Sequence, residues 1–163
     1  RRGKAVRCVI AVVLGLPVLL VVGALARGGA ERTPQTGVIS DAGVLSVTDL
    51  REGDCYNSRV VPPAPGATVP ISTVEAVPCT SPHTGQVVTK LAYPSTDPFE
   101  GVTAKANSHC AVSFADELDA SVLADPSYKA GYIAPADAVS WMRSPVVACI
   151  VATDEPLTRS LLG

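Results

Sequence analysis

Aromatic and histidine side chains are scarce in this sequence. Phe, Trp and Tyr make up 4% of the 163 residues, and there are only two histidines, His83 and His109. No H-x-x-x-H or H-E-x-x-H pair occurs, and no two cysteines stand in a C-x-x-C spacing. These absences argue against a catalytic zinc site, a zinc ribbon and a thioredoxin-type redox motif. The sequence also lacks a G-x-S-x-G element, a phosphate-binding P-loop and a dinucleotide-binding glycine fingerprint.

Clustered positive charge is absent from most of the chain. Residues 1–27 hold five basic and no acidic residues, whereas residues 28–163 hold eight basic and fifteen acidic residues, a net charge of −7. No run of Lys and Arg with interleaved aromatics appears. A region this acidic does not attract nucleic acid or an anionic lipid surface by charge. We therefore expect no nucleic-acid partner.

One long uncharged stretch is present at residues 8–26, where twelve of nineteen residues are Val, Ile or Leu. A helix of this length, at about 1.5 Å per residue, crosses a hydrocarbon core. We expect a basic cytoplasmic flank at residues 1–7 and a transmembrane helix at residues 8–27. Gly15, Pro17 and Gly23 give this helix small-residue faces against which another membrane helix can pack.

The charges around this stretch predict its orientation. Four basic residues precede it, Arg1, Arg2, Lys4 and Arg7, and the positive-inside rule places them in the cytoplasm. The remainder of the chain then lies on the outer, periplasmic or cell-wall side of the plasma membrane. The alternative is a secretory leader cleaved after Ala26, but the run exceeds the usual 7–15 apolar residues of such leaders.

Beyond the stretch, residues 28–46 are rich in Gly, Thr and Ser, and we interpret them as a flexible linker. Residues 47–163 have the size of one domain. Their few aromatics predict a modest core that covalent cross-links would reinforce. Four cysteines lie in this domain: Cys55, Cys79, Cys110 and Cys149. In an oxidising compartment they predict two structural disulfides, and four cysteines allow three pairings.

Residue periodicity predicts an α+β fold. Short strands are expected after the Glu52-Gly53-Asp54 turn and over residues 72–77, 86–92 and 145–152, the second and third forming a hairpin. Over residues 102–118 apolar side chains recur every four positions, which is typical of an amphipathic helix. We therefore expect an antiparallel sheet of about four strands with this helix packed on it. Order along the chain favours Cys110 with Cys149 and Cys55 with Cys79.

Few side chains qualify as a site. Asp54 follows Gly53 in a turn and is expected to accept backbone N–H groups. His83 follows a proline, so its ring is expected to shape the loop by bonding a backbone carbonyl rather than to act as a general base. Trp141 fits the core better than a contact surface, but if it is exposed it is the best candidate for contact with a partner. A carboxylate within reach of His83 would instead favour a site near Asp54, Tyr56 and His83.

A resemblance follows from the order of several short elements. They are Leu50-x-x-Gly53-Asp54-Cys55-Tyr56, Val77-Pro78-Cys79-x-x-Pro82-His83, Cys110, Pro135 with Trp141, Cys149, and Ser160-Leu161-x-Gly163. This order resembles the septum formation domain family of high-GC Gram-positive bacteria over residues 47–163. The resemblance implies a single N-terminal transmembrane helix, a link to septation and no catalytic residues. Thr84 and Gln86 stand where members commonly carry acidic residues.

These observations predict a non-enzymatic interaction module outside the membrane, with no cofactor and no metal. As an accessory subunit it would join a larger envelope complex, in septation, lipid or solute transport, or respiratory assembly, through an integral membrane protein partner. Tyr56, His83 and Trp141 are its candidate contact residues. The alternative is an envelope enzyme or ligand-binding receptor that uses Asp54, Tyr56 and His83.

Overall fold

The computed structural model describes residues 28–58 and 72–162. Its main sheet has six strands, antiparallel throughout, in the order β3-β5-β4-β6-β8-β7. The strands are β3 (Gly43–Ser46), β4 (Cys55–Asn57), β5 (Thr73–Val77), β6 (His83–Ala92), β7 (Tyr128–Ile133) and β8 (Val146–Leu157). A separate two-stranded ribbon pairs β1 (Glu31–Arg32) with β2 (Ile39–Asp41).

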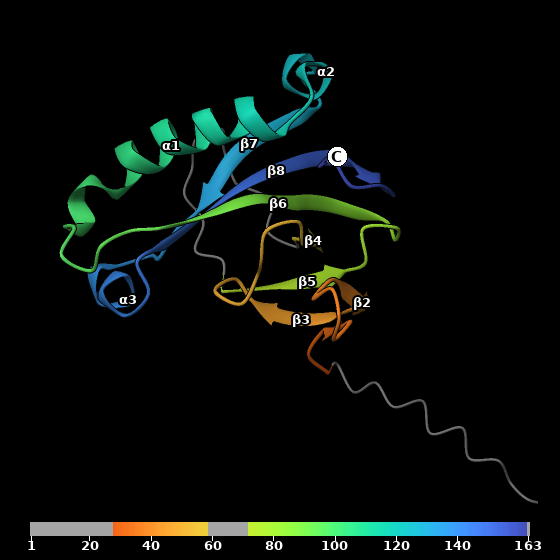
Figure 1. Ribbon diagram of the computed structural model, residues 1–163, viewed down its shortest axis with the longest axis horizontal. Coiled ribbons are helices and arrows are strands. Elements are labelled where there is room, and N and C mark those ends of the chain that lie inside the picture. Colours follow the sequence, from red (N-terminus) through yellow and green to blue (C-terminus); the bar gives the residue numbers. More distant parts are fainter. Residues whose placement is uncertain (1–27, 59–71, 163) are drawn as a thin grey trace, which may run out of the picture.

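The helical segments are η1 (Phe99–Gly101), α1 (Val102–Glu117), α2 (Ala120–Ala124) and α3 (Ala138–Arg143). The long helix α1 lies across one face of the sheet, over β6, β8 and β7 (Figure 1). Helix α3 lies beyond one end of the sheet (Figure 1). The predicted α+β class with one main helix on an antiparallel sheet is therefore confirmed. Within the described ranges, no helix has the length and hydrophobicity that a bilayer-spanning segment needs.

The amphipathic pattern of α1 produces the core on its side of the sheet. Val102, Ala106, Cys110 and Phe114 follow at four-residue intervals, and all four side chains are buried. They pack against Val88 and against the β8 side chains of Val147, Cys149 and Val151. Alternation along β6 and β8 turns Val87 and Ala148 to the other face, where a second cluster forms with Leu50 and Tyr56.

The expected sheet of about four strands is too small. Two strands are added at its edges, β3 beside β5 and β7 beside β8. β3 has only four residues, Gly43–Ser46, and residues 28–46 show no lasting periodicity, so the sequence pattern gave no strand there. Its register comes from pairing with β5, which a local pattern does not encode.

The expectation of a flexible linker over residues 28–46 is also wrong, because this segment folds into strands. This segment contains β1, β2 and β3, and Ile39 within it is 3% exposed. Val44 N–H donates to the carbonyl of Gly28 at 3.3 Å, beside the β3 edge. The ordered unit therefore includes residues that a boundary at residue 47 would leave out.

The predicted hairpin between residues 72–77 and 86–92 does not form. Both strands exist, but β4 lies between them and pairs with each. β4 has only three residues, too few for a recognisable alternation, yet it supplies the hydrogen bonds that a direct hairpin would have made.

The predicted cytoplasmic flank at residues 1–7 and the predicted transmembrane helix at residues 8–27, with Gly15, Pro17 and Gly23, lie outside the described residues.

Candidate functional site

The candidate site is centred on the turn that leads into β4. Gly53 has φ +81°, a left-handed conformation that favours glycine, and its N–H donates to the carbonyl of Val87 at 2.9 Å. Val87 N–H in turn donates to the carbonyl of Asp54 at 2.9 Å. The turn is therefore fixed against the middle of β6, and it places the Asp54 and Cys55 side chains on opposite sides of the backbone.

Asp54 is the most enclosed carboxylate of the site, with 5% of its surface exposed. Its Oδ2 accepts the backbone N–H of Arg51 at 2.7 Å, which confirms the predicted role as a turn acceptor. The Arg32 guanidinium adds a bidentate contact, Nη1 to Oδ1 at 2.7 Å and Nη2 to Oδ2 at 2.6 Å. The hydrogen bond to Asp54 raises the pKa of Arg32. Sequence reasoning missed Arg32, which lies in the segment assigned to the linker.

Two disulfides join Cys55 to Cys79 and Cys110 to Cys149, so the predicted pairing is confirmed. The first ties the start of β4 to the segment after β5. The second ties α1 to β8, which lies between β6 and the edge strand β7. A spacing of 39 residues in the second bridge corresponds to about 4 kcal/mol in the chain-entropy estimate, which is large beside typical domain stabilities.

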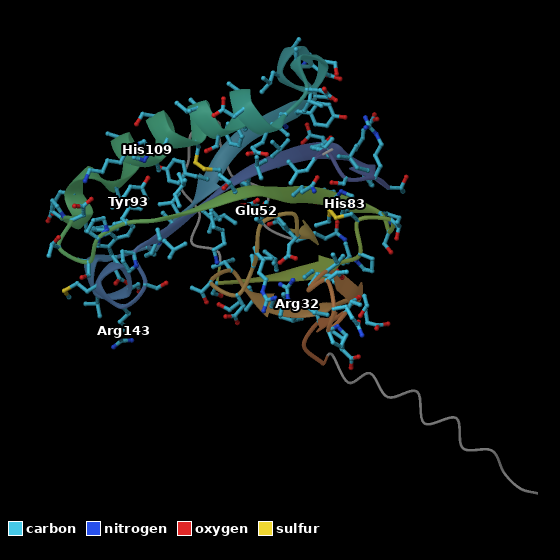
Figure 2. The ribbon with its side chains drawn as sticks, viewed as in Figure 1. Arg32, Glu52, His83, Tyr93, His109 and Arg143 are labelled. Atoms are coloured by element: carbon cyan, nitrogen blue, oxygen red, sulfur yellow. A yellow bond between two sulfur atoms is a disulfide. The ribbon has the colours of Figure 1, made fainter. Side chains whose placement is uncertain are left out.

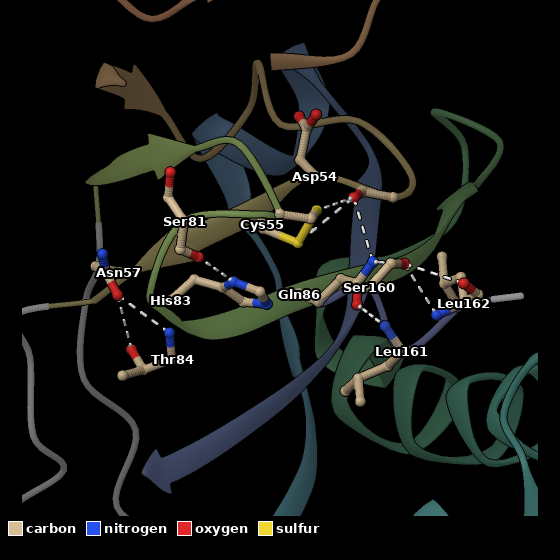
Figure 3. The surroundings of a disulfide bond; sticks show 12 residues. Asp54, Cys55, Asn57, Ser81, His83, Thr84, Gln86, Ser160, Leu161 and Leu162 are labelled. Carbon is tan, nitrogen blue, oxygen red and sulfur yellow. Dashed lines mark hydrogen bonds between the residues drawn. A yellow bond between two sulfur atoms is a disulfide. The ribbon is translucent and has the colours of Figure 1, made fainter. Parts of the chain in front are cut away.

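His83 begins β6 and is completely buried. Its Nδ1 lies 2.9 Å from the carbonyl oxygen of Ser81, which only accepts, so Nδ1 carries the hydrogen. Nε2 has no hydrogen-bond partner among the described residues. No hydrogen bond joins His83 to Asp54, whose carboxylate points away from the ring (Figure 3). The contact to Ser81 is the loop-shaping contact that the sequence predicts.

Gln86 lies beside the first disulfide and holds the end of the chain. Its Nε2 donates to Ser160 Oγ at 2.8 Å and to the carbonyl of Gly53 at 3.3 Å, and its Oε1 accepts the N–H of Leu161 at 2.7 Å (Figure 3). Gln86 is 1% exposed, so these bonds satisfy a buried amide. We call this group the C-terminal clasp. Only the position of Gln86 in a strand was predicted, since its partners Gly53, Ser160 and Leu161 are 33, 74 and 75 residues away.

The structure places all three candidate contact residues in the interior. Tyr56 is 3% exposed and lies against Gly85, where an added Cβ would be 2.5 Å from Tyr56 Cζ. Burial raises the pKa of the Tyr56 hydroxyl well above its usual range. Trp141 is 1% exposed and donates from Nε1 to the carbonyl of Asp97 at 2.8 Å. With His83 also buried, none of these three rings presents a contact surface.

Two hollows lie on the surface of the described residues, and neither is lined by these three rings. A hollow of about 150 Å³ lies on the solvent side of the first disulfide; it is lined by residues 36–39 and 51–55, with Val77 and Cys79. A second, of about 460 Å³, lies between the end of β6 and α1, where the rings of Tyr93 and His109 stack at 5.7 Å. The two labelled rings lie side by side in Figure 2. His109 is exposed, and its contact with Tyr93 was not predicted.

No group of three or more His, Cys, Asp or Glu side chains within residues 28–58 and 72–162 could hold a metal ion. Fold and site together define a disulfide-linked α+β domain whose buried polar side chains form hydrogen bonds to backbone groups and to less buried side chains. No protein-family model matches the chain, and no curated protein or solved structure matches it.

Proposed function

We propose that this chain is a non-enzymatic interaction module outside the plasma membrane, anchored by one N-terminal transmembrane helix. In this proposal it is an accessory subunit of a larger cell-envelope membrane complex and contacts an integral membrane protein. The single observation that supports it most strongly is the combination of two disulfides in one domain with an uncharged apolar run at residues 8–26. Disulfides persist outside the cytoplasm, and such a run is long enough to span a bilayer.

The chemistry of the site favours a binding module over an enzyme. Asp54 is held by Arg32 and by the Arg51 N–H, and His83 Nδ1 is bonded to a backbone carbonyl. A general base must reach a substrate proton, whereas the His83 ring is completely enclosed. These groups stabilise a small domain with few aromatic residues. The alternative of an enzyme or receptor at Asp54, Tyr56 and His83 has no such support.

The sequence resemblance bears on where in the cell such a subunit would act. The ordered elements from Leu50 to Gly163 resemble the septum formation domain family, which supports a role in the cell envelope. Septation, lipid or solute transport, and respiratory assembly are the processes in which such a subunit would act. Gly15, Pro17 and Gly23 would allow close packing of a partner's transmembrane helix.

Copurification tests the proposal directly. The full chain carries a tag beyond Gly163 on a flexible linker, and the complex is extracted from membranes in a mild detergent. We expect an integral membrane protein to co-elute in fixed proportion. A control chain, with residues 8–26 replaced by an unrelated apolar helix, separates contacts of the helix from contacts of the outer domain. Elution as a monomer without partner would contradict the subunit proposal.

Protease added to intact cells tests the orientation separately. We expect the domain to be digested, or released from the cell, while a cytoplasmic reference protein stays intact. Protection of the domain until the cells are lysed would contradict its proposed location outside the plasma membrane.

A further inference from the structure

The two disulfides differ in their access to solvent. Cys110 and Cys149 are 2% and 0% exposed, and they lie in the core between α1 and β8. Cys55 is also fully buried, but its partner Cys79 is partly exposed. Both Cys55 and Cys79 line the 150 Å³ hollow. An attacking thiol can therefore reach the first bridge from solvent, whereas the second is covered by packed side chains.

The hollow is lined by charges of both signs: Glu52 and Asp54 lie in its lining with Arg51, and Asp54 is paired with Arg32. One wall is formed by residues 36–39, and the other by the turn that contains Arg51 and Glu52. The Arg51 guanidinium leans across towards Gly37, where an added Cβ would lie 3.1 Å from Arg51 Nη1. Arg51 is exposed, and it forms no ion pair within the described ranges. Its positive charge raises the local concentration of a thiolate, which is the reactive form of a thiol.

We propose that the Cys55–Cys79 bridge is a thiol–disulfide exchange site that opens in the folded protein. Its reaction partner is a dithiol. A thiolate of the dithiol attacks Cys79 Sγ, and the electron pair of the broken S–S bond leaves on Cys55 Sγ, which takes a proton. The second thiol of the dithiol then loses its proton and attacks the other dithiol sulfur, which is bonded to Cys79 Sγ in the mixed disulfide. Cys79 leaves as a thiolate and is protonated. The dithiol is oxidised to a disulfide by two electrons, which reduce Cys55 and Cys79.

The surrounding contacts confine this opening to one segment. After the bridge breaks, residues 78–82 keep two hydrogen bonds to the sheet. Asn57 Nδ2 still donates to the carbonyl of Pro82 at 3.2 Å, and His83 Nδ1 still contacts Ser81. The second bridge continues to hold α1 on β8. Reduction therefore loosens the segment over His83 without unfolding the domain.

Graded reduction of the full chain tests the proposal. The protein, in mild detergent without denaturant, is treated with dithiothreitol for increasing times and quenched with acid. Free thiols are labelled with one alkylating reagent; after unfolding and full reduction the remaining thiols are labelled with a heavy isotopic form. Peptide mapping then gives the open fraction of each bridge. We expect Cys55–Cys79 to open at least about tenfold faster than Cys110–Cys149, with the far-UV circular dichroism unchanged.

The second bridge is the internal control, and the same experiment in denaturant should bring the two rates close together. Equal rates in the native protein, or faster opening of Cys110–Cys149, would overturn the proposal. Loss of the circular dichroism signal in step with the first opening would also overturn it.

A charge variant tests the role of Arg51. Arg51→Gln should slow opening by the anionic thiol mercaptoethanesulfonate several-fold, while opening by neutral 2-mercaptoethanol changes little. Arg143→Gln is the matched control, because Arg143 is an exposed cation on α3, well away in Figure 2 from Glu52, which lines the hollow. An unchanged ratio of the two thiols in Arg51→Gln would overturn the role assigned to this side chain.

Discussion

The Arg32 and Asp54 side chains form a far better shielded ion pair than Lys129 and Asp154. The first two are 16% and 5% exposed, whereas the second two are 59% and 79% exposed. Charges in water interact weakly, because solvent screens them and two long side chains must be ordered. A shielded carboxylate that loses its partner keeps its desolvation cost without compensation. The two pairs should therefore respond very differently to substitution.

Removing the positive charge in Arg32→Gln leaves Asp54 with only the Arg51 N–H as a described partner. We expect the free energy of unfolding to fall by about 3 kcal/mol. Lys129→Gln is the control, with an expected change within about 0.5 kcal/mol. Urea titration of the full chain in mild detergent measures both midpoints. Similar shifts in the two variants would show that shielding of the Arg32–Asp54 pair is unimportant.

Among the elements, the short helix α3 depends on one exposed capping residue. Asp137 Oδ1 accepts the N–H of Ser140 at 2.7 Å at the start of Ala138–Arg143. This hydrogen bond lowers the pKa of Asp137. A carboxyl group whose pKa is lower in the folded state stabilises that state at pH values above its unfolded pKa of about 4. The contribution is lost as the pH falls through the lowered value.

We therefore expect the protection of the Ser140 amide against hydrogen exchange to decrease as the pH drops below about 4. Asp137→Asn caps the helix through a neutral oxygen. In this variant the protection factor of the Ser140 amide should depend little on pH and should be close to the wild-type value at neutral pH. Asp137→Ala should lower protection at every pH. Measurement by NMR-detected exchange distinguishes the three chains. A pH-independent protection factor in the wild-type chain would contradict the role of the carboxylate.

The elements also show how far the sequence alone could lead. The buried stripe of α1 follows from its four-residue periodicity. Strands β5, β6 and β8 follow from alternating, β-branched and continuously apolar runs, each long enough to recognise. β3 and β4 have four and three residues, and their places are decided by their pairing partners. In the site, Gly53 and Asp54 have local turn chemistry and were predicted. Arg32 and the partners of Gln86 were not, because their contacts join distant parts of the chain.

At the scale of the whole molecule, residues 28–46 are part of the domain. They contribute Arg32 to the ion pair, Ile39 to the second core cluster and β3 to the edge of the sheet. A chain starting at residue 47 would leave the Asp54 carboxylate without Arg32 and the outer edge of β5 unpaired. Unpaired strand edges promote association between chains.

Two truncated chains test this boundary. We expect a chain of residues 28–163 to unfold cooperatively in urea with the stability of the full chain. A chain of residues 47–163 should lose at least about 3 kcal/mol and associate in size-exclusion chromatography. Both are produced in an oxidising compartment, and complete disulfide formation is checked in each. Identical midpoints and monomeric elution of both would show that residues 28–46 are dispensable.

The position of β8 in the sheet sets an order for biosynthesis. β8 follows the other described strands in the sequence, yet it lies between β6 and β7 and carries Cys149 beneath α1. The N-terminal strands β3, β5, β4 and β6 are contiguous in the sheet, so they can assemble, and the Cys55–Cys79 bridge can close, while the rest of the polypeptide is still emerging. Helix α1 and strand β7 must wait until β8 has been made, because β7 pairs with β8 and Cys110 of α1 is bonded to Cys149. A nascent chain stalled before residue 146 would thus carry one closed bridge and one reduced Cys110.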